Sequence, residues 1–98
     1  MEIIFEWDAR KARINLEKHK VSFEEACTIF HDPLLVTFSD DLHSKTEERF
    51  ISIGTSERER LILVVHTEHD EKDNQIIIRI ISCRKTALSE RKTYEEHK

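Results

Sequence analysis

Residues 60–83, RLILVVHTEHDEKDNQIIIRIISC, contain two long apolar runs that are rich in β-branched side chains. Leu61 to Val65 and Ile76 to Ile78 consist of residue types that pack well on a pleated, half-buried surface. The acidic segment 68–74 between them is typical of an exposed connection. This stretch therefore predicts an antiparallel hairpin, and its apolar clusters argue against a disordered chain.

The remaining elements are predicted by working outward from this hairpin. Asp8 and Ser22 precede apolar-periodic segments and predict helix N-caps, and Glu25 completes a capping box with Ser22. Pro33 is expected to end the second helix and to push Asp32 out of helical geometry. The predicted order is β-α-α-β-β-β-β-α: a strand at 2–7, a helix from Asp8, a helix from Ser22 to Pro33, strands at 34–38, 47–53, 60–67 and 75–83, and a helix capped by Thr86.

The fold class expected from this order is α+β. Consecutive strands with short connections indicate an antiparallel β-sheet meander, with the two N-terminal helices packed on one face and a C-terminal helix at the end. Gly54 is expected to end the strand 47–53, and the polar residues 39–46 are expected to form an exposed loop. A chain of 98 residues suits one compact domain, so we expect a single domain over residues 1–98.

Composition limits the class of protein and its compartment. The two cysteines, Cys27 and Cys83, form no disulfide framework and indicate free thiols in a reducing cytosol. No stretch approaches the length of a membrane span, and residues 1–6 lack the features of a secretory signal. We therefore expect a soluble, cytoplasmic protein with no membrane partner.

The net charge of −4 is unusual for a nucleic-acid-binding protein, but the charge is unevenly distributed. Counting Lys and Arg against Asp and Glu gives +1 for residues 1–20, −6 for 21–57, −2 for 58–74 and +3 for 75–98. The basic C-terminal segment could hold phosphate while the acidic middle faces another partner.

Several arginines lie within or beside the predicted strands, among Ile and Val. Because side chains alternate along a strand, Arg49, Arg60 and Arg79 fall on one face if both hairpin connections hold an even number of residues. An Arg among apolar neighbours must pair with a carboxylate or open onto a ligand, since burying it unpaired is costly. A structural ion pair explains a single such Arg best. Three converging arginines favour an anion site, because the guanidinium fork matches phosphate geometry.

A second group of candidate residues lies near the C-terminal end of the chain. Its members are Arg84, Lys85, Glu90, Arg91 and Tyr94. Glu90 and Tyr94 stand one helical turn apart, and Arg91 and Tyr94 share a helix face. A charged helix of this kind is most often a solvated surface.

The six histidines raise the question of a metal site. His66 and His69 have an H-x-x-H spacing, but an odd separation along a strand puts them on opposite faces. Neither cysteine has a nearby ligand partner, so no metal and no cofactor are expected. His66 could transfer protons near neutral pH, although a plain sheet histidine is the commoner role. The chain has no glycine-rich phosphate loop and no G-x-S-x-G elbow, which sets those enzyme classes aside.

Almost the whole chain resembles the BrnT family of type II toxins. The matching stretches are Phe5-Glu6-Trp7-Asp8, Asn15-x-x-Lys18-His19, Val21-Ser22-Phe23-Glu24-Glu25-Ala26, Phe30-x-Asp32-Pro33, Glu48-Arg49, Gly54, Arg60-Leu61-Ile62-Leu63-Val64, Arg79-Ile80-Ile81-Ser82-x-Arg84 and Glu90-Arg91-x-x-Tyr94. Lys20 stands where the family usually has Gly, and Cys83 where Ala is common. We expect Lys20 to affect the turn between the first two helices.

The resemblance implies a RelE-like α+β fold, ribonuclease activity that arrests growth, and a cognate antitoxin. The antitoxin of this family, BrnA, resembles ribbon-helix-helix DNA-binding proteins. The resemblance also implies that the complex represses its own operon, so that this chain meets operator DNA only through the antitoxin.

On this basis we expect cleavage of RNA without a metal, in which the ribose 2′-hydroxyl attacks the adjacent phosphate. Arg49, Arg60, Arg79 and Arg84 are the residues expected to stabilise the phosphoryl charge. The residues expected to move protons are His66, Glu90 or Tyr94.

Two other functions stay open at the level of the sequence. One is a non-enzymatic binding module that complexes a DNA-binding partner and modulates its operator binding. The other is a plain structural subunit. Incubating the purified protein with RNA separates the enzyme from the binding module, and the structural subunit would show no toxicity when expressed alone.

Overall fold

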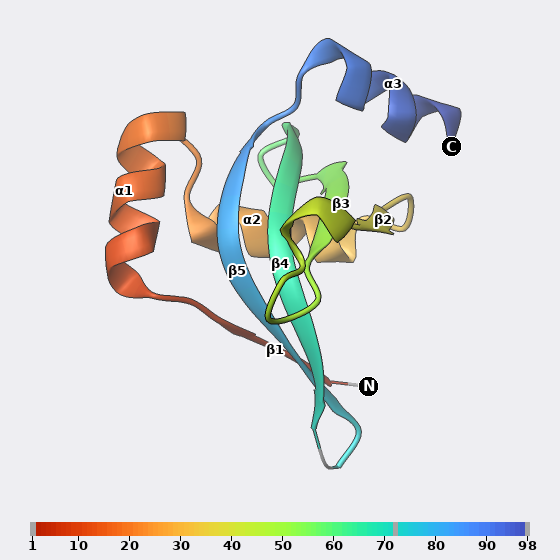
Figure 1. The fold of residues 1–98 in the computed structure, drawn as a ribbon. Coiled ribbons are helices and arrows are strands. Elements are labelled where there is room, and N and C mark those ends of the chain that lie inside the picture. Colours follow the sequence, from red (N-terminus) through yellow and green to blue (C-terminus); the bar gives the residue numbers. More distant parts are fainter. Residues whose placement is uncertain (1, 72, 98) are drawn as a thin grey trace.

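A five-stranded sheet with the strand order β1-β5-β4-β3-β2 forms the centre of the fold (Figure 1). The computed structural model describes residues 2–71 and 73–97. The elements are β1 (Glu2–Glu6), α1 (Ala9–His19), α2 (Phe23–Thr28), the 3-10 turn η1 (Ile29–His31), β2 (Val36–Ser39), the 3-10 turn η2 (Asp41–His43), β3 (Phe50–Thr55), β4 (Leu61–Glu71), β5 (Gln75–Lys85) and α3 (Leu88–Glu96).

The predicted hairpin is confirmed as the β4–β5 pair, and it is longer than expected. The two strands pair antiparallel from Ile62↔Lys85 to Glu71↔Gln75, so part of the acidic segment predicted as a loop is strand. Its acidic side chains fit a strand because residues 68–70 are exposed to solvent. Asp73 and Asn74 carry the reversal with φ of 66° and 62°, a conformation that Asp and Asn tolerate well.

The sheet is mixed, which corrects the prediction of an antiparallel meander. Strands β2 to β5 do form antiparallel neighbours, but β1 pairs parallel with β5 from Glu2↔Gln75 to Glu6↔Arg79. The error has a physical reason. Alternation of apolar residues predicts a strand but not its partner. Strand β1 pairs with a strand some 70 residues further along the chain, and no short connection between the two strands indicates this pairing.

The helices are also arranged differently from the prediction, because they cover both faces of the sheet. Helix α2 and η1 pack on one face, called here the helix face, where the core consists of Val21, Phe23, Ala26, Ile29, Ile62, Val64, Ile78, Ile80 and Cys83. Helix α3 packs on the other, called here the groove face, where a smaller cluster joins Tyr94 to Ile53 and Leu63. Figure 1 shows α1 standing beside β5.

Asn15 of α1 completes the edge of β5. Strand β1 pairs only with residues 75–79 of β5, which leaves the rest of that edge without a strand neighbour among the described residues. There the Asn15 amide donates to the Cys83 carbonyl at 2.9 Å and accepts from the Cys83 N–H at 3.1 Å. Burial raises the pKa of the Cys83 thiol to about 12, so the thiol stays protonated. The Asn15 side chain therefore makes, with the backbone of Cys83, the two hydrogen bonds that a neighbouring strand would otherwise make.

Two of the predicted N-caps are confirmed, with one difference. The Asp8 carboxylate accepts from the N–H of Arg10 at 2.8 Å, and Ser22 Oγ accepts from the N–H of Glu25 at 3.0 Å. The Glu25 carboxylate does not close the capping box, because it binds Ser56 and Arg60 instead. The second helix ends as Pro33 predicts, with Asp32 in an extended conformation at φ −72° and ψ 118°.

Two details of the chain path differ from the sequence prediction. Helix α3 is capped from Ala87 rather than Thr86, since the Glu90 carboxylate accepts from the Ala87 N–H at 2.6 Å. Gly54 lies inside β3 and does not end it. A Cβ at Gly54 would come within 2.9 Å of Leu35 Cδ1 and 3.1 Å of Ile29 Cβ, so glycine is needed there for space.

Lys20 adopts the left-handed conformation that ends α1, with φ of 60°. Its N–H reaches the Leu16 carbonyl at 2.9 Å, which is the hydrogen bond of a left-handed helix end. The turn therefore forms with lysine in a conformation that favours glycine, at a cost of roughly 1 kcal/mol.

Candidate functional site

A groove of about 550 Å³ lies on the groove face of the sheet, and we call it the sheet groove. Its apolar lining consists of Phe38, Ile51, Leu63, Val65 and Ile81. Its polar lining consists of Asp40, His43, Arg49, Ser82, Arg84 and Glu90. Three of the seven predicted site residues, Arg49, Arg84 and Glu90, therefore meet in one place.

A register shift in the β4–β5 pair shapes one wall of this groove. Val65 pairs with Ser82 but His66 pairs with Ile80, so Ile81 is the extra residue of a β-bulge. As a result, the neighbours Ile81 and Ser82 both line the sheet groove, which strict alternation would not allow.

Glu90 holds Arg84 in a two-pronged ion pair. Arg84 Nη1 donates to Glu90 Oε1 at 2.8 Å, and Arg84 Nη2 donates to Oε2 at 2.7 Å. The Arg84 hydrogen bonds lower the pKa of Glu90, and Glu90 in turn raises the pKa of Arg84, so both groups are charged near neutral pH. Glu90 is thus suited to orient the guanidinium rather than to donate a proton.

The guanidinium of Arg49 has no hydrogen-bond or ion-pair partner among the described residues, although its backbone is firmly held. The Arg49 N–H donates to Ser44 Oγ at 2.9 Å, and its carbonyl accepts from the Asp40 N–H at 2.8 Å. A half-buried arginine with a fixed backbone and a free fork is equipped to bind an anion in the groove.

Asp40 and His43 form a pair that the sequence patterns did not predict. His43 Nδ1 lies 3.0 Å from both carboxylate oxygens of Asp40. An ionised carboxylate only accepts hydrogen bonds, so with Asp40 ionised Nδ1 is the donor, and in the neutral ring Nε2 is then an acceptor. The His43 side chain is 67% exposed and that of Asp40 is 11% exposed. Residues 39–46 were predicted to be a plain exposed loop, and the D-x-x-H spacing was the available signal.

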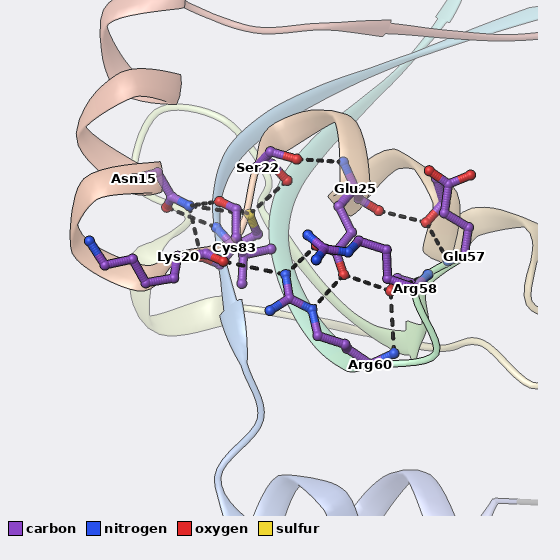
Figure 2. A network of polar contacts seen from close by, with 11 residues as sticks. Asn15, Lys20, Ser22, Glu25, Glu57, Arg58, Arg60 and Cys83 are labelled. Atoms are coloured by element: carbon purple, nitrogen blue, oxygen red, sulfur yellow. Dashed lines mark hydrogen bonds and ion pairs between the residues drawn. The ribbon is translucent and has the colours of Figure 1, made fainter.

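Arg60 lies elsewhere, in a polar network around the buried Glu25 (Figure 2). Arg60 Nε donates to Glu25 Oε2 at 2.9 Å, Ser56 Oγ donates to the same oxygen at 2.7 Å, and a second Arg60 nitrogen pairs with Oε1. Arg60 also donates to the Lys20 carbonyl at 3.3 Å. The Arg60 hydrogen bonds hold the pKa of Glu25 below its usual value, although burial opposes them. This network links α2 to the α1–α2 turn, through the Lys20 carbonyl, and to the β3–β4 connection, through Ser56 and Arg60.

His66 is fully buried on the helix face, where it stacks beside Phe50 and meets the edge of Phe30. Its Nε2 is 2.7 Å from Ser52 Oγ, which in turn is 2.7 Å from Thr37 Oγ1. Burial lowers the pKa of His66 to about 4, so the ring is neutral near pH 7. These contacts are those of a neutral core histidine.

His69 is half exposed, and its Nε2 lies 3.9 Å from Glu47 Oε2. His66, three residues earlier on the same strand, is fully buried. The two rings of the H-x-x-H pair therefore point to opposite faces, as predicted.

Tyr94 and Arg79 are held by other partners. The Tyr94 hydroxyl donates to Asp32 Oδ2 at 2.7 Å and lies 3.3 Å from Thr55 Oγ1. Arg79 Nη1 is 3.6 Å from Glu6 Oε1 at the β1 side of the sheet. Neither residue lines the sheet groove.

The prediction that Arg49, Arg60 and Arg79 share a face is wrong for Arg60. The β3–β4 connection consists of residues 56–60, an odd number, and Phe50 pairs with His66. Arg49 therefore takes the face of Val65, whereas Arg60 takes that of Ile62. Arg79 pairs with Thr67 and so shares the face of Arg49, but lies beyond the groove.

Metal-binding and membrane-spanning features are both missing from the described part of the chain. Within residues 2–71 and 73–97, no three His, Cys, Asp or Glu side chains gather as metal ligands would. None of the helices in those ranges is long and apolar enough to cross a bilayer.

Comparisons with known proteins point to one family. A family model described as "Ribonuclease toxin, BrnT, of type II toxin-antitoxin system" matches residues 7–90. The crystal structure of the Brucella abortus ribonuclease toxin BrnT aligns with a TM-score of 0.59 at 20% identity, covering 90% of this chain and 100% of that one. That likeness shows a shared fold. No curated protein sequence matches the chain.

Removing Arg60 should destabilise the protein. Arg60→Ala leaves the buried Glu25 carboxylate with Ser56 and with the exposed Arg58, whose Nη1 is 3.8 Å from Oε1. Removing the main partner of a buried ion pair typically costs about 3–5 kcal/mol. The double variant Arg60→Ala/Glu25→Gln should regain part of the lost stability, because residue 25 then carries no buried charge. Urea denaturation of the wild type, the single variants Arg60→Ala and Glu25→Gln, and the double variant measures the coupling between Arg60 and Glu25. An Arg60→Ala protein with the stability of the wild type would exclude this structural role and make Arg60 a candidate for the reaction again.

Stability should fall as the pH is lowered from about 6.5 to about 4, and His66 should account for part of the fall. The His66 pKa is 6.5 when unfolded and about 4 when folded, so the unfolded chain binds the extra proton first. The contribution reaches about 3 kcal/mol at the acid end. The free energy of unfolding of His66→Gln should therefore depend less on pH. Parallel pH profiles for the two proteins would contradict a buried, neutral His66.

Proposed function

The chain belongs to the BrnT family of ribonuclease toxins of type II toxin–antitoxin systems, and from this premise we propose that the sheet groove is its RNA-cleaving site. The observation that carries the proposal is the free guanidinium of Arg49, which shares the groove with Arg84. The free fork of Arg49 and the Arg84 N–H groups that Glu90 and the Lys85 carbonyl do not engage offer donors to the non-bridging oxygens of a phosphodiester. The apolar floor provides a surface on which a base can lie.

The proposed reaction uses the RNA's own nucleophile and needs no metal. The ribose 2′-oxygen attacks the adjacent phosphorus in line, and the bond from phosphorus to the 5′-oxygen breaks. The 2′-oxygen gives up its proton to the protein, and the leaving 5′-oxygen takes up a proton from water. The products are a 2′,3′-cyclic phosphate and a 5′-hydroxyl. Negative charge grows on the phosphoryl oxygens, and fixed donors at that point are worth about 3–4 kcal/mol each.

The residues of the groove divide these tasks between them. Arg49 binds the phosphoryl oxygens, and Arg84 does so from the position that Glu90 gives it. His43 accepts the 2′-proton at Nε2, because Asp40 holds the other ring nitrogen as a donor. In this proposal Arg60, Arg79, His66 and Tyr94 act through the fold, by the contacts that hold them outside the groove.

Membership of a type II family implies an antitoxin partner. We propose that it is a BrnA-like ribbon-helix-helix protein that covers the sheet groove in the cytoplasm and carries the complex to operator DNA. Large apolar side chains near the groove support a protein contact there. Phe38 lines it at 41% exposure, Leu42 precedes His43 at 86%, and Leu88 precedes Glu90 by two residues at 71%.

Purified protein should cut RNA in the presence of EDTA and leave 2′,3′-cyclic phosphate ends. The expectation follows from a nucleophile supplied by the RNA, and product ends can be read by mass spectrometry. Activity that chelation abolishes and a divalent ion restores would contradict the metal-free route. A folded protein that binds RNA or the antitoxin but never cuts would favour the non-enzymatic binding module.

Substitutions in the groove should remove activity without unfolding the protein. Arg49→Lys keeps the charge but loses the fork, so kcat should fall on the order of 100-fold. His43→Gln should lower kcat by about 10²–10⁴-fold through loss of the proton acceptor. The matched control is Lys45→Gln, an exposed charge in the same loop that does not line the groove. Full activity in both groove variants would show that the reaction takes place elsewhere.

A further inference from the structure

A second groove of about 220 Å³ lies between α1 and β5, and we call it the helix groove. Helix α1 contributes Lys11, Ile14, Asn15, Lys18 and His19 to it. Strand β5 contributes Ile81 and Ser82, the same two residues of the bulge that line the sheet groove. The two grooves therefore meet at the bulge, and a ligand in the sheet groove can continue across β5 onto α1.

The two grooves differ in formal charge. In the sheet groove, Arg49 and Arg84 are balanced by Asp40 and Glu90, which leaves no net formal charge for holding a polyanion. The helix groove has Lys11 and Lys18 and no carboxylate in its lining. Both lysines are exposed, and neither has an ion-pair partner among the described residues. Of the two grooves, the helix groove therefore has the stronger long-range attraction for a polyanion.

The geometry of α1 suits an extended polyanion. Lys11 and Lys18 are seven residues apart and so share one helix face, separated by about 10 Å. At that separation their ammonium groups reach different phosphates. Ile14 lies between them at 53% exposure and offers an apolar surface to a base. The Asn15 bonds to Cys83 fix this helix face against β5.

We propose that the helix groove binds the backbone of single-stranded RNA on one side of the scissile phosphate, where Lys11 and Lys18 each neutralise a phosphate. The inference rests on the proposed function of the sheet groove, since continuity with that groove is what distinguishes RNA from another polyanion. Binding in the helix groove contributes affinity for longer RNA and leaves the chemical step unchanged.

The test compares Lys11→Gln/Lys18→Gln with Arg10→Gln/Arg13→Gln. Both variants remove two positive charges from α1, and glutamine has a helix propensity close to those of lysine and arginine. Arg10 and Arg13 are exposed and line neither groove. The probe is a fluorescent 2′-O-methyl RNA of about 12 nucleotides, which its own 2′-oxygen cannot cut. Its binding is measured over a range of salt concentrations.

The lysine variant should bind this RNA on the order of tenfold more weakly. Its log–log salt slope should be shallower by about 1.4, or about 0.7 for each phosphate that a lysine no longer neutralises. The arginine control should match the wild type. With cleavable RNA, KM should rise for the long substrate while kcat, and all parameters for a trinucleotide, stay unchanged.

Equal affinities and salt slopes for the wild type and the lysine variant would overturn the proposal. So would a lysine variant that binds RNA normally but binds the antitoxin weakly, because the surface would then be a protein interface. Since binding is measured on uncleavable RNA, a protein that binds through these lysines but cuts nothing would refute the proposed reaction and not this RNA-binding surface.

Discussion

The register shift between Val65 and His66 determines which side chains of β5 reach the groove face. With strict alternation, Arg84 would share a face with Ile78 and Ile80, which lie in the core under α2 and η1. The extra residue at the bulge reverses the alternation, so that Cys83 enters that core and Arg84 turns to Glu90 on the other side. One inserted residue thus allows β5 to serve a hydrophobic core at one end and a polar site at the other.

Features of the fold that depend on residues close together in the sequence could be predicted, and features that depend on distant residues could not. Local signals were sufficient for the caps at Asp8 and Ser22, the stop before Pro33 and the β4–β5 hairpin. The parallel pairing of β1 with β5 and the β-bulge were not predicted, because both depend on residues far apart in the chain. Conformational preference also yields to context, as Lys20 shows by taking a left-handed position that a glycine would occupy more easily.

The candidate site was only partly predictable for the same reason. Arg49, Arg60 and Arg84 look alike in the sequence, each next to apolar or charged neighbours. In the fold, Arg49 has a free fork, Arg84 is braced by Glu90, and Arg60 neutralises the buried Glu25. These differences arise from partners 6 to 35 residues away and from the odd number of residues in the β3–β4 connection. The alternation of apolar and polar residues along a strand reveals neither. The pair in the loop 39–46 was not predicted because that loop lacks a periodic pattern.

The net charge of −4 is a poor guide to what this protein binds, because its charges are separated in space. Glu68 and Asp70 lie on β4 near the turn of the β4–β5 hairpin, and the buried Glu25 is paired with the half-buried Arg60. Among the described residues that line the two grooves, the Lys and Arg side chains without a carboxylate partner are Arg49, Lys11 and Lys18. At physiological salt, charges act over roughly 8 Å, so an approaching polyanion responds to this local field and not to the sum over the chain. The helix face, with its buried histidine and glutamate, can then stabilise the fold without constraining the reaction proposed for the other face.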